Sequence, residues 1–101
     1  MGKIRMGIIG TGMAFEKLHY PAYQELKDKF QIVCVCDSDL AKAKNWQEAL
    51  GLKQEDIYSD YQQMLQRTGI DAFDIMVPIE LNYQVLKEVA KAGKPIICEK
   101  P

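Results

Sequence analysis

The sequence lacks any concentration of positive charge. Its 13 lysines and arginines are balanced by 14 aspartates and glutamates, which leaves a net charge of -1 at pH 7. A nucleic-acid-binding surface needs a stripe of basic side chains that neutralises successive phosphates. Because no segment concentrates lysine and arginine in this way, we expect no nucleic-acid partner.

Long apolar runs are also absent. The longest apolar stretches have the length of a β-strand, whereas a membrane-spanning helix needs about 20 apolar residues. The N-terminus does not have the positive-then-hydrophobic order of a secretory signal. The sequence therefore predicts no membrane partner and a cytoplasmic location.

Cysteine and histidine are scarce. The three cysteines lie within apolar segments, and His19 is the single histidine. An odd number of cysteines in apolar surroundings favours reduced thiols in a core over a disulfide framework. Cys34 and Cys36 would share one face of a strand, but two thiols without further cysteine or histidine nearby make a poor metal site. We predict packing for both and no metal.

What the sequence does contain is an alternation of apolar strands and amphipathic helices. Its 101 residues are 48% hydrophobic and 27% charged, as expected for one domain spanning residues 1–101. The expected strands are Ile4–Ile9, Ile32–Cys36, Ile57–Tyr58, Ala72–Val77 and Pro95–Cys98. The helical spacing between them covers about residues 13–29, 40–50, 61–65 and 81–89.

This alternation predicts an α/β fold with a Rossmann-like, doubly wound parallel sheet. Each continuous apolar strand must bury two sides, so helices are expected on both faces of the sheet. Right-handed crossovers with one reversal of winding give the strand order 3-2-1-4-5. Ligands of such sheets bind beyond the carboxyl ends of the strands at the reversal, which here falls between the first and fourth strands.

The turn after the first strand has the composition of a dinucleotide-binding turn. Gly10 permits a sharp turn, and Gly12 has no side chain to keep the backbone away from a pyrophosphate. The helix that follows presents its N-terminus to the phosphates. We therefore assign five consecutive residues to cofactor binding: Gly10, Thr11, Gly12, Met13 and Ala14.

Two further strand ends complete the predicted crevice. Asp37 ends the second strand and is placed to accept hydrogen bonds from an adenosine ribose, while its charge would repel a 2'-phosphate. This favours NAD, with NADP as the alternative cofactor. Pro78 ends the fourth strand and would form the opposite wall.

Several side chains are better explained by packing than by chemistry. The third glycine of the dinucleotide fingerprint falls on Phe15, so either the helix stands slightly away from the sheet or Phe15 points outward. His19 lies just before Pro21, which removes a helix donor, and we predict a structural role for this histidine. Three aromatic residues occur at the spacing expected of core or boundary packing, so we do not expect them to stack on a ligand: Trp46, Tyr58 and Tyr61.

Four motifs resemble those of one family. They are Gly7-Ile8-Ile9-Gly10-Thr11-Gly12, His19-Tyr20-Pro21-Ala22, Val35-Cys36-Asp37, and Ala92-Gly93-Lys94 leading to Glu99-Lys100-Pro101. With these motifs the whole chain resembles the N-terminal cofactor domain of the glucose-fructose oxidoreductase, inositol dehydrogenase and MocA family. The resemblance implies that the C-terminal substrate domain of such enzymes is absent from this chain.

The resemblance also implies an activity. Members transfer hydride between NAD(P) and a secondary alcohol of a sugar, cyclitol or related compound, so the expected partner is a small polyol or sugar. The lysine of the Glu-Lys-Pro motif points at the nicotinamide in this family, which makes Lys100 the candidate catalytic residue and places Glu99 in the cofactor site. An ammonium group stabilises a developing alkoxide. The family also implies a homo-oligomer, to which an uncovered last strand would add a self-associating edge.

The chain departs from the family after the fourth strand. Members commonly carry Thr-Pro and then histidine four residues after the proline, whereas this chain has Val77-Pro78 and then Asn82. We expect cofactor contacts from Pro78 and Asn82 but no imidazole chemistry there.

Two other functions share part of the pattern. A methyltransferase-type domain that binds S-adenosylmethionine also uses a glycine turn and an acid after the second strand, but it does not explain Glu99-Lys100-Pro101. A non-catalytic nucleotide-sensing module would use the same turn without turnover.

Overall fold

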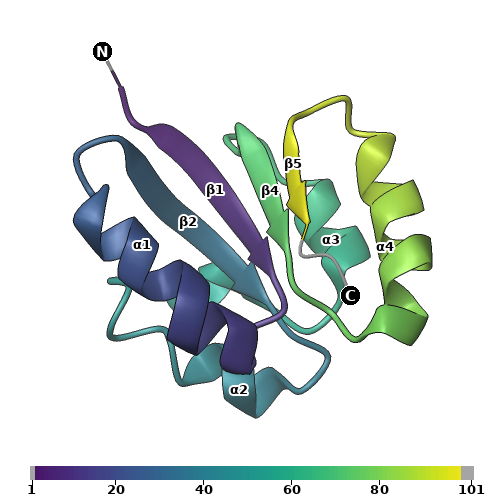
Figure 1. Ribbon diagram of the computed structural model, residues 1–101, viewed down its shortest axis with the longest axis horizontal. Helices are drawn as coiled ribbons and strands as arrows, with labels where there is room; N and C mark the ends of the chain where they lie inside the picture. The colour runs from purple at the N-terminus through teal and green to yellow at the C-terminus, as the bar shows by residue number, and fades with distance from the viewer. Residues whose placement is uncertain (1, 99–101) are drawn as a thin grey trace.

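A computed structural model describes residues 2–98 of the chain (Figure 1). The strands are β1 (Ile4–Ile9), β2 (Phe30–Cys36), β3 (Ile57–Tyr58), β4 (Ala72–Ile75) and β5 (Ile96–Cys98). The helices are the π-helix η1 (Phe15–His19), α1 (Tyr20–Glu25), α2 (Leu40–Lys44), the 3-10 helix η2 (Gln54–Asp56), α3 (Tyr61–Leu65) and α4 (Ile79–Ala90). Among residues 2–98, no helix combines the length and the apolar character needed to cross a membrane.

The five strands form one parallel sheet in the order β3-β2-β1-β4-β5. This confirms the predicted doubly wound Rossmann fold and the reversal between β1 and β4. At the carboxyl end of β1, Ile9 lies between Cys36 of β2 and Ile75 of β4. The segments that follow these three strands therefore leave the sheet side by side.

Helices cover both faces of the sheet, as the apolar strands predict (Figure 1). Side chains that alternate along the strands divide the buried residues into two clusters. One cluster packs against η1 and α2: Met6, Ile8, Phe15, Ile32, Val35, Ala43 and Ala72. The other packs against α3 and α4: Ile9, Cys34, Cys36, Met64, Ile70, Phe73, Ile75, Val85 and Val89.

The two cysteines of β2 belong to this second cluster, which confirms the prediction that they pack in the core. Cys34 and Cys36 are both buried free thiols. Burial raises the pKa of each thiol to about 12, so both stay protonated at neutral pH.

Two helices are shorter than the sequence predicts. The first helical segment ends at Glu25 instead of residue 29, because Leu26 leaves the helical region and its carbonyl accepts the N–H of Phe30, where β2 begins. The second ends at Lys44, and the N–H of Trp46 bonds three residues back, to Ala43. The apolar spacing out to Leu50 identified a packed face correctly, but that face belongs to a series of turns.

The strand ends also differ by one or two residues. β2 begins two residues before the predicted Ile32, and β5 begins at Ile96 instead of Pro95. β4 ends at Ile75 instead of Val77. β1 ends at Ile9 and the chain turns sharply at Gly10, while the Met76 N–H just beyond β4 still donates to the carbonyl of Ile9.

The first helix is irregular where a disruption was expected. Residues 15–19 have π geometry directly before Pro21, and the N–H of Tyr20 bonds to the carbonyl of Phe15, five residues back. Phe15 is fully buried, and its ring meets the Trp46 ring edge-on with centroids 4.8 Å apart. The suggestion that Phe15 points outward is therefore wrong: its ring fills the space beneath the helix.

Candidate functional site

The glycine turn that follows β1 is pressed against the neighbouring strands. Gly10 has a φ of 100°, and its N–H donates to the carbonyl of Cys36 at 2.8 Å. A Cβ atom on Gly10 would lie 2.1 Å from the carbonyl oxygen of Met76. Both the backbone conformation and the space require glycine here, as predicted from the sequence.

Gly12, unlike Gly10, has free space where a side chain would lie. A Cβ atom on Gly12 would meet nothing within 4 Å. The next residues begin the helical segment, with Met13 exposed and Ala14 half-buried. This bare backbone at a helix start provides the space and the N–H groups that a pyrophosphate requires, so the turn fits the diphosphate of a dinucleotide.

Thr11 connects the glycine turn to the end of β2. Its backbone N–H and its hydroxyl both donate to Oδ2 of Asp37, each at 2.9 Å. Its carbonyl accepts the indole N–H of Trp46 at 3.4 Å. Thr11 is only 5% exposed, so these contacts hold it inside the turn.

Asp37 lies beside the glycine turn, as its place after β2 predicts. Its Oδ1 accepts the N–H of Asp39 at 2.9 Å, and the Asp37 N–H donates to Tyr58 of β3. Asp39 in turn caps α2 through Ala41. The structure therefore brings Gly10, Thr11, Gly12 and Asp37 together at the carboxyl edge of the sheet.

The opposite wall is formed by the start of α4. Pro78 occupies the position just before this helix, and its carbonyl accepts the N–H of Leu81. Asn82 lies one turn further on, and its Oδ1 accepts the thiol of Cys98 at the end of β5 at 3.2 Å. Asn82 thus faces the strand that leads to Glu99 and Lys100, which lie outside the described residues.

A buried polar cluster beneath the first helix was missed in the sequence. Asp74 of β4 is 1% exposed, and its Oδ2 lies 2.7 Å from Nδ1 of His19 and accepts the hydroxyl of Tyr23 at 2.8 Å. Burial first, and then the charge of Asp74, raises the pKa of Tyr23. The available clue was a lone carboxylate within an otherwise apolar strand. The cluster ties the helix to the sheet and agrees with a structural role for His19.

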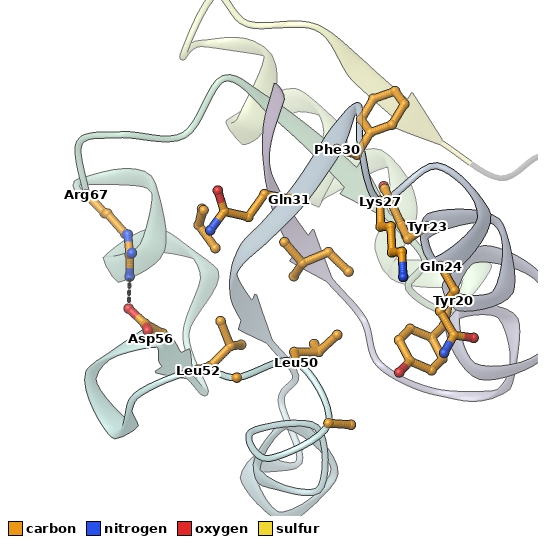
Figure 2. A pocket seen from close by; sticks show the side chains of 14 residues that line it. Tyr20, Tyr23, Gln24, Lys27, Phe30, Gln31, Leu50, Leu52, Asp56 and Arg67 are labelled. Atoms are coloured by element: carbon orange, nitrogen blue, oxygen red, sulfur yellow. Dashed lines mark hydrogen bonds and ion pairs between the residues drawn. The ribbon is translucent and has the colours of Figure 1, made fainter. Parts of the chain in front are cut away.

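A hollow lies on the protein surface away from the glycine turn (Figure 2). It measures about 480 Å³ and lies beside the beginning of β2, whereas Asp37 follows the end of that strand. In Figure 2, Tyr20 and Lys27 project on one side of β2, and Arg67 on the other is paired with Asp56 at 2.7 Å. Of the predicted site residues that the structure describes, none lines it. Within residues 2–98, no three cysteine, histidine or acidic residues are grouped to hold a metal ion.

A family model described as an oxidoreductase family with an NAD-binding Rossmann fold matches residues 4–101. The chain belongs to this family, the glucose-fructose oxidoreductase, inositol dehydrogenase and MocA oxidoreductases. As a member it is an NAD-binding Rossmann domain, and this membership selects the oxidoreductase prediction over the methyltransferase alternative.

Relatives of this oxidoreductase domain are longer proteins. An uncharacterized protein of Saccharomyces cerevisiae is 32% identical over 101 residues, which are 100% of this chain and 29% of the relative. The D-glucoside 3-dehydrogenase of Escherichia coli is 31% identical over 97% of this chain and 27% of its own length. The chain therefore spans less than a third of these two relatives.

A solved relative of the domain is the WlbA dehydrogenase from Bordetella pertussis, in complex with NADH and UDP-GlcNAcA. It superposes with a TM-score of 0.86 at 30% sequence identity, over 99% of this chain and 30% of that chain. The fold of residues 2–98 is thus the fold of an oxidoreductase cofactor domain.

Proposed function

We propose that this domain is the cofactor half of an enzyme that transfers hydride between NAD and a secondary alcohol of a sugar or a related polyol. The main support for the proposal is a glycine turn with open space at Gly12 and an acid beside it. That acid, Asp37, accepts two hydrogen bonds from Thr11 of the same turn. The E. coli relative is a D-glucoside dehydrogenase and the solved WlbA complex holds a nucleotide-linked sugar, which supports a sugar-like substrate.

The adenosine and diphosphate parts of the cofactor are assigned to the first two strand ends. Gly10 and Gly12 keep the turn free of side chains, and the N–H groups that begin the helix at Met13 and Ala14 hold the phosphates. Asp37 accepts a ribose hydroxyl. Its negative charge opposes a 2'-phosphate, so the domain prefers NAD to NADP.

The nicotinamide end is assigned to the other wall. The start of α4 at Pro78 and the amide of Asn82 border the place where β5 ends. Pro78 and Asn82 would hold the nicotinamide end there, and the bound cofactor would supply the hydride chemistry for the alcohol carbon. The ammonium group of Lys100 stabilises the negative charge that develops on the substrate oxygen, and Glu99 contributes to the cofactor site.

We further propose that residues 1–101 act together with a separate substrate domain, because the relatives are more than three times as long. Alone, the 101-residue chain binds NADH and turns nothing over, since substrate positioning is missing. The free thiols of Cys34 and Cys36 suit a reducing cytoplasm. We expect the complete enzyme to be a homo-oligomer.

The decisive experiment uses the enzyme with both domains and a panel of free and nucleotide-linked sugars. We expect NAD reduction with at least one sugar, and Lys100→Met should lower kcat by at least about a hundredfold while the Kd for NADH changes less than about threefold. A nearly normal kcat in Lys100→Met would contradict the role of Lys100. Absence of turnover with every sugar would contradict the substrate class.

A further inference from the structure

The Asp37 carboxylate is held by three protein donors. Oδ2 accepts both the N–H and the hydroxyl of Thr11, and Oδ1 accepts the N–H of Asp39, all at 2.9 Å. An ionised carboxylate offers about four acceptor positions, two on each oxygen. In this arrangement Oδ2 is fully used, and the position that remains for a ligand is on Oδ1.

Thr11 is itself fixed on its other sides. Its carbonyl accepts the indole N–H of Trp46, and it follows Gly10, whose N–H is bonded to the carbonyl of Cys36. It is 5% exposed. The two Thr11 donors that reach Asp37 therefore belong to a hydrogen-bonded frame that joins β1, β2 and the turns after α2.

We propose that Thr11 is a positioning residue for cofactor selection. Its hydroxyl fixes Asp37 so that the open acceptor position on Oδ1 meets a ribose hydroxyl and the carboxylate cannot turn away from a 2'-phosphate. The inference rests on the proposed function of Asp37 as the ribose acceptor. It adds that the preference for NAD is set by the Thr11–Asp37 pair and not by the acid alone.

The physical reason is that charge repulsion discriminates only while the charge stays in place. An aspartate side chain rotates between staggered positions at little cost unless contacts hold it. In this protein a rotation of Asp37 would break its bonds to Thr11 and leave a buried hydroxyl without its acceptor. Hydrogen bonds to a charged group are strong enough to shift such an equilibrium by about tenfold.

The test compares Thr11→Val with Thr11→Ser. Valine keeps the branched shape and the backbone N–H but removes the hydroxyl, whereas serine keeps the hydroxyl. The Kd values of NADH and NADPH are measured by titration for each protein. We expect the ratio of the two affinities to fall about tenfold in Thr11→Val, mainly because NADPH binds better, and to stay within about twofold of wild type in Thr11→Ser.

The ratio of NADH affinity to NADPH affinity separates a positioning role from general damage, because a disturbed turn weakens the binding of both cofactors equally. If wild type prefers NADH and Thr11→Val keeps that preference, the inference is overturned and the proposed function stands. Equal affinities in wild type would remove both the role of Asp37 and the inference. If wild type binds neither dinucleotide at millimolar concentration, the proposed function itself has failed.

Discussion

Gly10 and Met76 approach so closely that no side chain fits between them. A Cβ atom on Gly10 would lie 2.1 Å from the Met76 carbonyl oxygen, and the Gly10 φ of 100° disfavours any other residue. This contact brings the turn after β1 against the chain that leaves β4. The close approach fixes the glycine turn beside the segment that leads to α4.

Replacing Gly10 with alanine should therefore damage the fold. The new methyl group must displace backbone, which costs at least about 3 kcal/mol of unfolding free energy when the strain of the positive φ is added. Urea denaturation followed by circular dichroism measures this loss. Gly12→Ala is the matched control, because its Cβ meets nothing within 4 Å. Equal stability of the Gly10→Ala variant and wild type would contradict the described contact.

The buried cluster around Asp74 predicts a stability effect far from the cofactor turn. Tyr23→Phe removes one of the donors to a carboxylate that is 1% exposed, and should lower the free energy of unfolding by about 1–3 kcal/mol. Tyr83→Phe provides the comparison, because Tyr83 is exposed, and should change stability by less than about 0.5 kcal/mol. Thermal denaturation of the two variants decides the matter: the same small effect in both would mean that the Tyr23 hydroxyl contributes nothing.

Low pH should reduce the stability of the folded protein, in part because Asp56 becomes protonated. Burial on its own raises the pKa of Asp56, but hydrogen bonds from the Lys53 N–H and from Arg67 outweigh burial and bring that pKa below the usual 3.8. A carboxyl group with a lowered folded-state pKa adds stability above its unfolded pKa, and this stability disappears as the pH falls through the folded value.

The stability difference between wild type and Asp56→Asn should therefore be full at pH 7 and shrink below about pH 4. Comparing the two proteins cancels the contribution of other acids, such as Asp71 with its ion pair to Arg5. Urea denaturation at several pH values gives the difference directly. A difference that stays constant down to pH 3 would exclude the ionised Asp56–Arg67 pair as its source.

Much of this fold could be predicted because its strands leave few alternatives. Segments such as Ile4–Ile9 are almost wholly apolar, which requires helices on both faces of the sheet, and the turn at Gly10 and the acid at Asp37 mark two strand ends. What could not be predicted depends on contacts between distant residues. Periodicity identified the buried face around Trp46 but not the loss of helical bonding after Lys44.

The candidate site likewise has a part that the sequence predicted and a part that depends on contacts between distant residues. The sequence placed Asp37 next to the glycine turn, but not the two hydrogen bonds that Thr11 donates to it. Likewise, nothing in the spacing of His19, Tyr23 and Asp74 along the chain indicates that they meet, since Asp74 follows His19 by 55 residues and Tyr23 by 51. Such partners become visible only once the order of the strands is known.

We expect a dinucleotide to bind with its diphosphate against the backbone at Gly12. Trp46, the single tryptophan, donates its indole N–H to the same turn, so its fluorescence should report NADH at this site. The most direct measurement is an NADH titration of wild type and Gly12→Ala, followed through Trp46 emission. We expect saturable quenching in wild type. In Gly12→Ala we expect at least tenfold weaker binding, a loss of about 1.4 kcal/mol of binding free energy, with an unchanged melting temperature. Equal affinity in the two proteins, or no binding to wild type at millimolar NADH, would contradict it.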